Sequence, residues 1–243
     1  ALMTFILIFS SVTMVLAVDA GHHMQKEKVA FYMLLTIIGG AIFVGSQAWE
    51  WSNFIRGEYG AVETTGGQIF QFVNEKTDKR VALKDFAISG PSDRFQHQIN
   101  DGVWYSYEAT LPSYTVQEVI SGFNSNPNLI IKTEKIDEKG HKIKLSREES
   151  LQKITQAKNV VEGANLVRNE YGNRLFADFF FFITGFHGFH VFSGVIINII
   201  IFFNVLIGTY ERRGHYQMIE KVGLYWHFVD LVWVFVFTFF YLV

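Results

Sequence analysis

The sequence predicts an all-α bundle of membrane-spanning helices that carries a small α+β insertion outside the membrane. Of its 243 residues, 49% are hydrophobic and 16% are aromatic. The apolar residues are gathered in four long runs, which is typical of membrane helices and not of a soluble core. A polar segment with short alternating runs and turn clusters separates the second run from the third, and this segment predicts the insertion.

An α-helix needs about 20 predominantly apolar residues to cross roughly 30 Å of hydrocarbon. Four runs reach or approach that length, at residues 1–18, 29–49, 175–207 and 222–243. We therefore expect two helices within residues 1–52, an extramembrane insertion at residues 53–174 and two further helices within residues 175–243.

The run at residues 1–18 has a second interpretation, a secretory signal peptide. It begins at Ala1 without a positively charged leader, and Asp19-Ala20 is a poor cleavage site. These features favour a membrane-spanning helix, and we expect further sequence upstream of Ala1.

The distribution of charge predicts the orientation of the four helices. Outside the insertion, the basic residues all fall in two short connectors: Lys26, Lys28, Arg212, Arg213 and Lys221. Connectors rich in lysine and arginine face the cytoplasm, so the insertion lies on the opposite side, the periplasm of a bacterial inner membrane. The formal net charge of -2 argues against a nucleic-acid partner. The chain has no cysteine, which excludes disulfides and thiolate metal sites.

The insertion combines strand signals with helix signals. Runs at residues 68–73, 103–109 and 129–133 favour strands, and residues 89–91 and 125–127 favour turns.

A helix is predicted where the insertion returns to the membrane. Ser146 and Glu149 form a capping-box pattern, and apolar residues recur at helical spacing from Leu151 to Ala164. Aromatic residues at positions 104, 105 and 107 favour a packed module over a flexible tether, which stays the alternative.

A few ionisable residues interrupt the apolar runs. His187 and His190 lie three residues apart, as do His227 and Asp230, and Glu50 lies one turn from Gln47. Such a group costs roughly 2.5 kcal/mol or more at the bilayer centre, so each one needs a partner or a function.

Three functions are open to these groups: haem ligation, binding of a small metal, and hydrogen bonding between helices. His187 and His190 share one helix face and cannot grip a haem from opposite sides, which argues against ligation. We expect hydrogen bonding, with His227 and Asp230 as a charge-assisted pair and a proton relay as its alternative.

Two further features concern helix packing and lipid. The i, i+4 spacing of Thr184 with Gly188, and of Ala41 with Gly45, predicts close approach of helix backbones. Arg212 and Arg213 follow the longest apolar run, where phospholipid head groups lie, and are candidates for binding an anionic lipid.

Two strings of residues resemble the signatures of a known family. TGFHGFHVFSG at residues 184–194 and YWHFVDLVWVF at residues 225–235 resemble those of cytochrome c oxidase subunit III, in the same order. Residues 10–17 and 47–51 are similar, more loosely, to the fourth and fifth helices of that family. The resemblance covers the helices and not the insertion.

This resemblance implies that the helices are the last four of seven in a subunit of a proton-pumping haem-copper terminal oxidase. Family members bind no haem or copper; those cofactors belong to the catalytic partner subunits. Subunit III packs beside catalytic subunit I and subunit II, holds phospholipids and sustains proton uptake during aerobic electron transport. The resemblance therefore implies no active site in this chain.

The residues leave other functions open. Subunit III of a quinol oxidase is the nearest alternative, because nothing in this chain identifies the electron donor. A small transporter with a path through His187, His190 and His227 is another, although no internal repeat supports it. The insertion at residues 53–174 is a candidate for recruiting another respiratory complex, or for a binding module anchored by the helices. The family often has histidines directly after the position of Ala17, where this chain has Val18 and Asp19.

Overall fold

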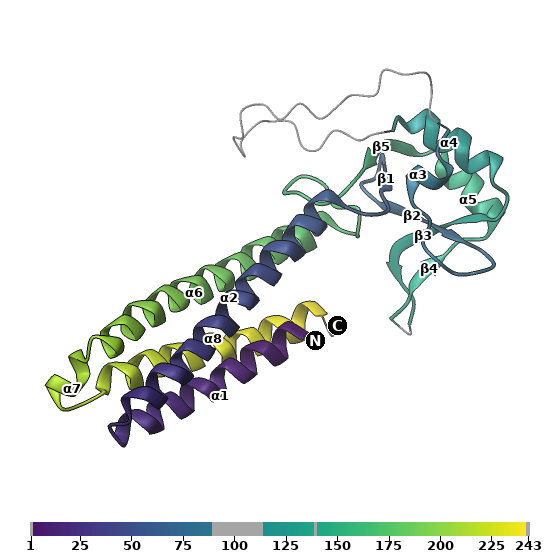
Figure 1. The fold of residues 1–243 in the computed structure, drawn as a ribbon. Helices are drawn as coiled ribbons and strands as arrows, with labels where there is room; N and C mark the ends of the chain where they lie inside the picture. The colour runs from purple at the N-terminus through teal and green to yellow at the C-terminus, as the bar shows by residue number, and fades with distance from the viewer. Residues whose placement is uncertain (1, 89–113, 139, 242–243) are drawn as a thin grey trace, which may run out of the picture. The chain divides into compact units, whose positions relative to one another are not determined.

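The computed structural model describes residues 2–88, 114–138 and 140–241. They form two compact units, of which one comprises residues 1–50 and 180–243 and the other residues 51–179. The first unit is helical, and the second contains a sheet with short helices (Figure 1).

Four helices of the chain are long and apolar enough to cross a membrane. They are α1 (Leu2–His22), α2 (Lys26–Arg56), α6 (Arg174–Leu206) and α8 (Gln217–Tyr241). A short helix, α7 (Thr209–Arg213), lies in the connector between α6 and α8. The predicted fold class and the four predicted spans are confirmed.

Helices α1 and α8 lie side by side, as their purple and yellow ribbons show in Figure 1. Trp226 Nε1 donates to Ser10 Oγ at 2.8 Å, and Trp233 Nε1 donates to Thr4 Oγ1 at 3.1 Å. Both indole rings are buried. Because the hydrocarbon core offers no water to accept an indole N–H, hydroxyl groups on α1 supply the acceptors.

Helix α2 approaches its neighbours through small residues. A Cβ added at Gly40 would lie 2.6 Å from Trp226 Cη2 and 2.7 Å from Val195 Cγ2. Next to it, Thr13 Oγ1 and Thr36 Oγ1 form a hydrogen bond of 2.8 Å between α1 and α2. Close backbone packing therefore depends on the absence of a side chain at Gly40.

The prediction of close approach at Ala41 and Gly45 is wrong. Both residues are exposed, and a Cβ at Gly45 would meet nothing within 4 Å. The i, i+4 pattern is present on this helix, but the face that packs is one position removed and runs through Thr36, Gly40 and Phe43.

The second unit is built on a five-stranded antiparallel sheet in the order β4-β3-β2-β1-β5. Its strands are β1 (Ala61–Thr64), β2 (Ile69–Asn74), β3 (Leu129–Ile136), β4 (Lys142–Lys144) and β5 (Ala157–Val161). Its helices are α3 (Leu83–Phe86), α4 (Val116–Ser125) and α5 (Arg147–Ile154). Strands β2 and β3 confirm the predicted strands at residues 68–73 and 129–133, and α4 ends at the predicted turn at 125–127.

The helices of the second unit pack on a compact aromatic core. The ring of Phe72 from β2 contacts the rings of Phe86 and Phe123, with centroids 4.8 and 5.5 Å away. Helix α5 begins with the predicted capping box, in which Ser146 and Glu149 satisfy each other's backbone N–H groups. The polar segment is therefore a folded module in the part that the structure describes.

The predicted helix after Ser146 is only partly correct. Helix α5 ends at Ile154, and residues 157–161 form strand β5, which pairs with β1. The apolar residues beyond Ile154 fit a helical spacing by coincidence, and pairing with β1 buries Val160 and Val161 on the sheet.

The predicted turn at residues 89–91, the predicted strand at 103–109 and the aromatic residues at 104, 105 and 107 lie outside the described residues.

The glycine contacts in the bundle give a test of its packing. We expect Gly40→Ala to destabilise the bundle by about 1 to 3 kcal/mol, because the new methyl group collides with Trp226 and Val195. Gly45→Ala is the matched control, since it adds the same methyl group to the same helix at an open position. Thermal unfolding of the purified chain in lipid nanodiscs would measure both, and equal midpoints would contradict this packing.

Candidate functional site

The predicted intramembrane histidines of α6 have different surroundings. His187 is 3% exposed and stacks on Trp233 with ring centroids 5.2 Å apart, and Phe43 meets it edge-on at 5.8 Å. His190 is half-buried, and its Nδ1 lies 2.8 Å from the carbonyl oxygen of Phe186. His187 therefore faces the bundle core, whereas His190 bonds within its own helix.

His187 Nε2 has no hydrogen-bond partner among the described residues. The ring lines a groove of about 250 Å³ between α6 and α8, together with His190 and the side chains of Phe186 and Val229. His187 and His190 are the polar residues that line this groove, and its other lining residues are apolar.

The predicted pair of His227 and Asp230 is not formed. His227 Nδ1 instead lies 2.6 Å from Ser11 Oγ on α1, a hydrogen bond between helices. Asp230 is 9% exposed, and its carboxylate interacts with the hydroxyl of the same Ser11. Residues three apart on a helix share a face, but the hydroxyl of Ser11 reaches His227 from the neighbouring helix.

His227 also lies at the inner end of a larger groove of about 520 Å³ between α1 and α8. Glu220 and Lys221 line the same groove nearer the start of α8, and Val15 and Leu224 line its apolar part. Glu220 Oε2 lies 3.9 Å from Nε2 of His22, the last residue of α1.

Glu50 is held by two helices. It accepts a hydrogen bond of 2.7 Å from the Tyr241 hydroxyl of α8 and a longer one of 3.4 Å from Gln47 Nε2. The contact with Gln47 follows from the sequence spacing, whereas the contact with Tyr241 joins residues 191 positions apart.

Arg212 and Arg213 occupy the last turn of α7, and both are exposed. Lys26 Nζ lies 3.5 Å from Glu211 Oε2, which ties the two predicted cytoplasmic connectors together. Lipid binding by the two arginines stays a prediction. In the described part of the chain, no group of three or more His, Cys, Asp or Glu side chains is placed to hold a metal ion.

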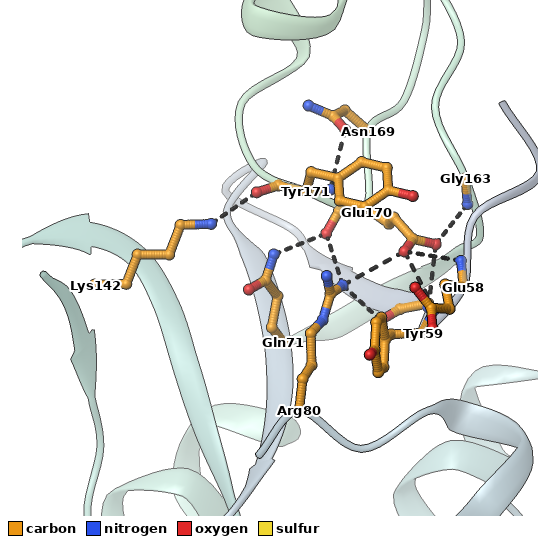
Figure 2. A network of polar contacts seen from close by, with 10 residues as sticks. Glu58, Tyr59, Gln71, Arg80, Lys142, Gly163, Asn169, Glu170 and Tyr171 are labelled. Atoms are coloured by element: carbon orange, nitrogen blue, oxygen red, sulfur yellow. Dashed lines mark hydrogen bonds and ion pairs between the residues drawn. The ribbon is translucent and has the colours of Figure 1, made fainter. Parts of the chain in front are cut away.

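A second polar cluster lies in the second unit, residues 51–179, which we call the outer module. It is formed where the chain continues from the end of α2 and where it leads into α6 (Figure 2). At its centre is Glu170, whose side chain is 0% exposed. Glu170 Oε2 accepts from the backbone N–H groups of Gly163 at 2.6 Å and Gly60 at 3.1 Å. Glu170 Oε1 accepts from those of Tyr59 at 3.3 Å and Glu58 at 3.4 Å. We call this group of contacts the Glu170 hub.

Arg80 balances the buried charge of Glu170. Its Nη2 lies 3.5 Å from Glu170 Oε1 and also donates to the carbonyl oxygens of Gly60 and Glu170. The guanidinium lies over the ring of Tyr59, 4.8 Å from its centroid, and 5.6 Å from the centroid of Tyr171. The carboxylate of Glu170 is thus buried together with the guanidinium of Arg80, and the guanidinium also stacks on two tyrosine rings.

The surroundings of the hub shift the pKa values of its neighbours. Burial, reinforced by Glu170, raises the pKa of Tyr171 to about 12. Burial also lowers the pKa of Lys142, whose Nζ donates to the Tyr171 carbonyl oxygen at 2.7 Å. These contacts hold the chain segments of the hub in place.

Two glycines allow the hub to form. Gly57 and Gly163 both have positive φ, 73° and 72°. A Cβ at Gly163 would collide with the carbonyl oxygen of Ile55, so the two chain segments could not approach. The sequence does not reveal this cluster, because Glu170 lies 110 to 112 positions from Glu58, Tyr59 and Gly60 and 90 positions from Arg80. The one local signal is a glycine directly after the end of α2.

Comparison with known proteins places the C-terminal part of the chain in context. Residues 161–243 match the family model described as Cytochrome c oxidase subunit III. Over 74 residues the chain is 40% identical to the probable cytochrome c oxidase subunit 3 of Rickettsia conorii, covering 30% of this chain and 26% of that protein. It is 39% identical over 79 residues to cytochrome c oxidase subunit 3 of Thermostichus vulcanus, covering 30% of this chain and 37% of that protein.

The chain thus spans about a quarter to a third of the length of these curated relatives. The matches confirm the resemblance indicated by the motifs on α6 and α8.

We expect Glu170→Gln to destabilise the outer module by about 3 to 5 kcal/mol, because it leaves Arg80 without its buried counter-charge. The amide N–H₂ group of the new glutamine would also face backbone N–H groups, from which it cannot accept a hydrogen bond. Glu58→Gln is the matched control, since Glu58 contributes a backbone N–H and its side chain is exposed. Amide hydrogen exchange at Gly60 and Gly163 in the full chain measures the effect, and equal protection in the two variants would argue against the hub.

Proposed function

We propose that this chain, whose residues 161–243 match the family model of cytochrome c oxidase subunit III, is a supporting subunit of a proton-pumping haem-copper terminal oxidase. In this role it stabilises the catalytic subunit, holds lipid and sustains proton uptake while its partners reduce O₂. Its own residues carry no redox centre. Haem and copper belong to the catalytic subunits with which it assembles.

One observation supports a structural role above the others: the two subunit III motifs pack directly against each other. Ser193 Oγ of the first motif and Tyr225 OH of the second form a hydrogen bond of 2.9 Å. A Cβ at Gly194 would lie 2.9 Å from Trp226 Cζ3, so the backbone of α6 passes close to the buried indole of α8. The residues that define the resemblance are therefore those that join α6 to α8.

The buried histidine fits the same role. His187 stacks on Trp233 and meets Phe43 edge-on, contacts that pack its ring against two aromatic side chains of the bundle. His227 is engaged by Ser11. These imidazoles favour helix packing over the paired axial ligation that a haem requires.

Asp230 supports assembly with a further subunit. A buried carboxylate whose recorded partner is one hydroxyl, that of Ser11, which His227 also engages, is costly in an apolar surrounding. We infer that a partner helix or a bound water in the assembled oxidase provides a further donor.

The orientation follows from the charged connectors. Lys26, Lys28 and the two arginines of α7 favour the cytoplasmic side of a bacterial inner membrane for these loops, with the outer module in the periplasm. There the module is available to another respiratory complex, for which its folded core makes a stable surface.

Capture of the tagged full chain from solubilised membranes tests this function. We expect partner subunits with oxidase haem absorbance and copper to copurify with it. Asp230→Leu should lower the yield of captured haem protein without changing its spectrum, because it removes the group that a partner completes. Stability of the isolated variant should be equal or higher, because a buried carboxylate is replaced by an apolar side chain.

Capture of the folded wild-type chain without any haem protein would contradict the proposal. A stoichiometric haem band that stays with the chain after all partners are removed would contradict the absence of a redox centre. The electron donor of the captured complex, cytochrome c or a quinol, can be assayed on the same material.

A further inference from the structure

An exposed apolar tip projects from the base of the outer module. Residues 164–169, which we call the stem turn, carry Leu166 at 68% exposure and Val167 at 58%. Asn165 Oδ1 accepts from the N–H groups of Val167 at 2.7 Å and Arg168 at 2.8 Å, and Asn165 N donates to the Arg168 carbonyl oxygen at 2.8 Å. The turn is thus fixed by its own hydrogen bonds, and two adjacent apolar side chains are held at its tip.

The stem turn is attached to the end of a membrane helix. Ala164 N donates to the carbonyl oxygen of Phe54, in the last turns of α2, at 3.1 Å. The rings of Phe54 and Tyr171 stack with centroids 4.7 Å apart and planes 10° from parallel. The loop between β5 and α6 therefore stays beside the end of α2 (Figure 1).

The length of α2 places this attachment near the lipid head groups. Its apolar stretch at residues 29–49 covers about 30 Å at roughly 1.5 Å per residue, which matches the hydrocarbon core. Phe54 follows five residues later along the same helix, about 7 Å beyond that core. The head-group layer is about 5 to 8 Å thick on each side, so the attachment lies within or at the edge of that layer.

The start of α6 has the same unusual surface. Leu175, Phe176 and Phe179 are 55%, 43% and 58% exposed. Helix α6 has 33 residues, about 50 Å at roughly 1.5 Å per residue, and so exceeds the hydrocarbon thickness. Apolar side chains are thus exposed in its first turns as well as in the stem turn.

Basic side chains accompany these apolar ones. Arg174, whose Nε lies 3.9 Å from Asp178 Oδ2, is exposed at the start of α6, and Arg56 is exposed at the end of α2. A guanidinium pairs well with the phosphate of a lipid head group, and its aliphatic part tolerates an apolar neighbour. Exposed Leu, Val and Phe side chains, together with arginines at the ends of two membrane helices, fit a lipid surface better than water.

We propose that the stem turn and the first turns of α6 form an interfacial anchor, in which Leu166 and Val167 insert into the outer boundary of the bilayer while Arg56 and Arg174 bind lipid phosphates. The stem turn thereby adds a membrane contact to those made by the ends of α2 and α6. This inference does not depend on the assignment to an oxidase.

Single-cysteine labelling of the full chain tests the anchor directly, because the natural sequence has no cysteine. A polarity-sensitive fluorophore is attached at Leu166→Cys, in nanodiscs of phosphatidylethanolamine and phosphatidylglycerol that contain a lipid with a nitroxide on its head group. Ile136→Cys is the matched control, an apolar residue of the same module with 64% exposure. We expect a blue-shifted, strongly quenched emission at position 166 and a weakly quenched, water-like emission at position 136.

A second variant separates insertion from mere proximity. With the fluorophore at Val167→Cys, Leu166→Glu should shift the emission to the red and reduce the quenching, because a carboxylate opposes insertion. Equal quenching at positions 166 and 136 would overturn the proposal. So would a blue shift at position 166 that appears only when partner subunits are added, since a protein and not lipid would then cover the tip.

Discussion

The structure depends on one constraint: inside the hydrocarbon core no water is available to complete a buried hydrogen bond. A polar side chain there is costly unless it finds a partner on another helix or on its own backbone. Trp226 with Ser10, His227 with Ser11 and Tyr241 with Glu50 are the results of this rule. Because each pair joins two different helices, the same bonds that satisfy the polar groups also fix which helices are neighbours.

Outside the bilayer this constraint no longer applies, and a buried carboxylate joins the chain segments instead. The 0%-exposed carboxylate of Glu170 collects four backbone N–H groups from two chain segments and pairs with Arg80. It thereby holds together the chain segment that enters the outer module and the segment that leaves it. In the membrane, polar side chains join helices. In the outer module, the carboxylate of Glu170 joins the chain segments next to strands β1 and β5.

The sequence was a good guide to the helices because bilayer thickness imposes a length that apolar runs reveal directly. It also revealed the α5 cap, since Ser146 and Glu149 interact locally. It was a poor guide to partners: His227 bonds Ser11 instead of Asp230, close packing occurs at Gly40 instead of Gly45, and the residues after Ile154 form a strand. Each of these depends on residues far apart in the chain, which periodicity does not encode. The Glu170 hub could not be found for the same reason.

The proposed role of this chain is to support an oxidase without carrying its redox chemistry. Its most direct test is sustained O₂ consumption by the assembled oxidase with and without the chain, recorded alongside the visible spectrum. We expect removal of the chain to leave the haem bands unchanged while turnover declines during continued catalysis. Loss of a haem band on removal would contradict the account, and so would full turnover over the same period without the chain.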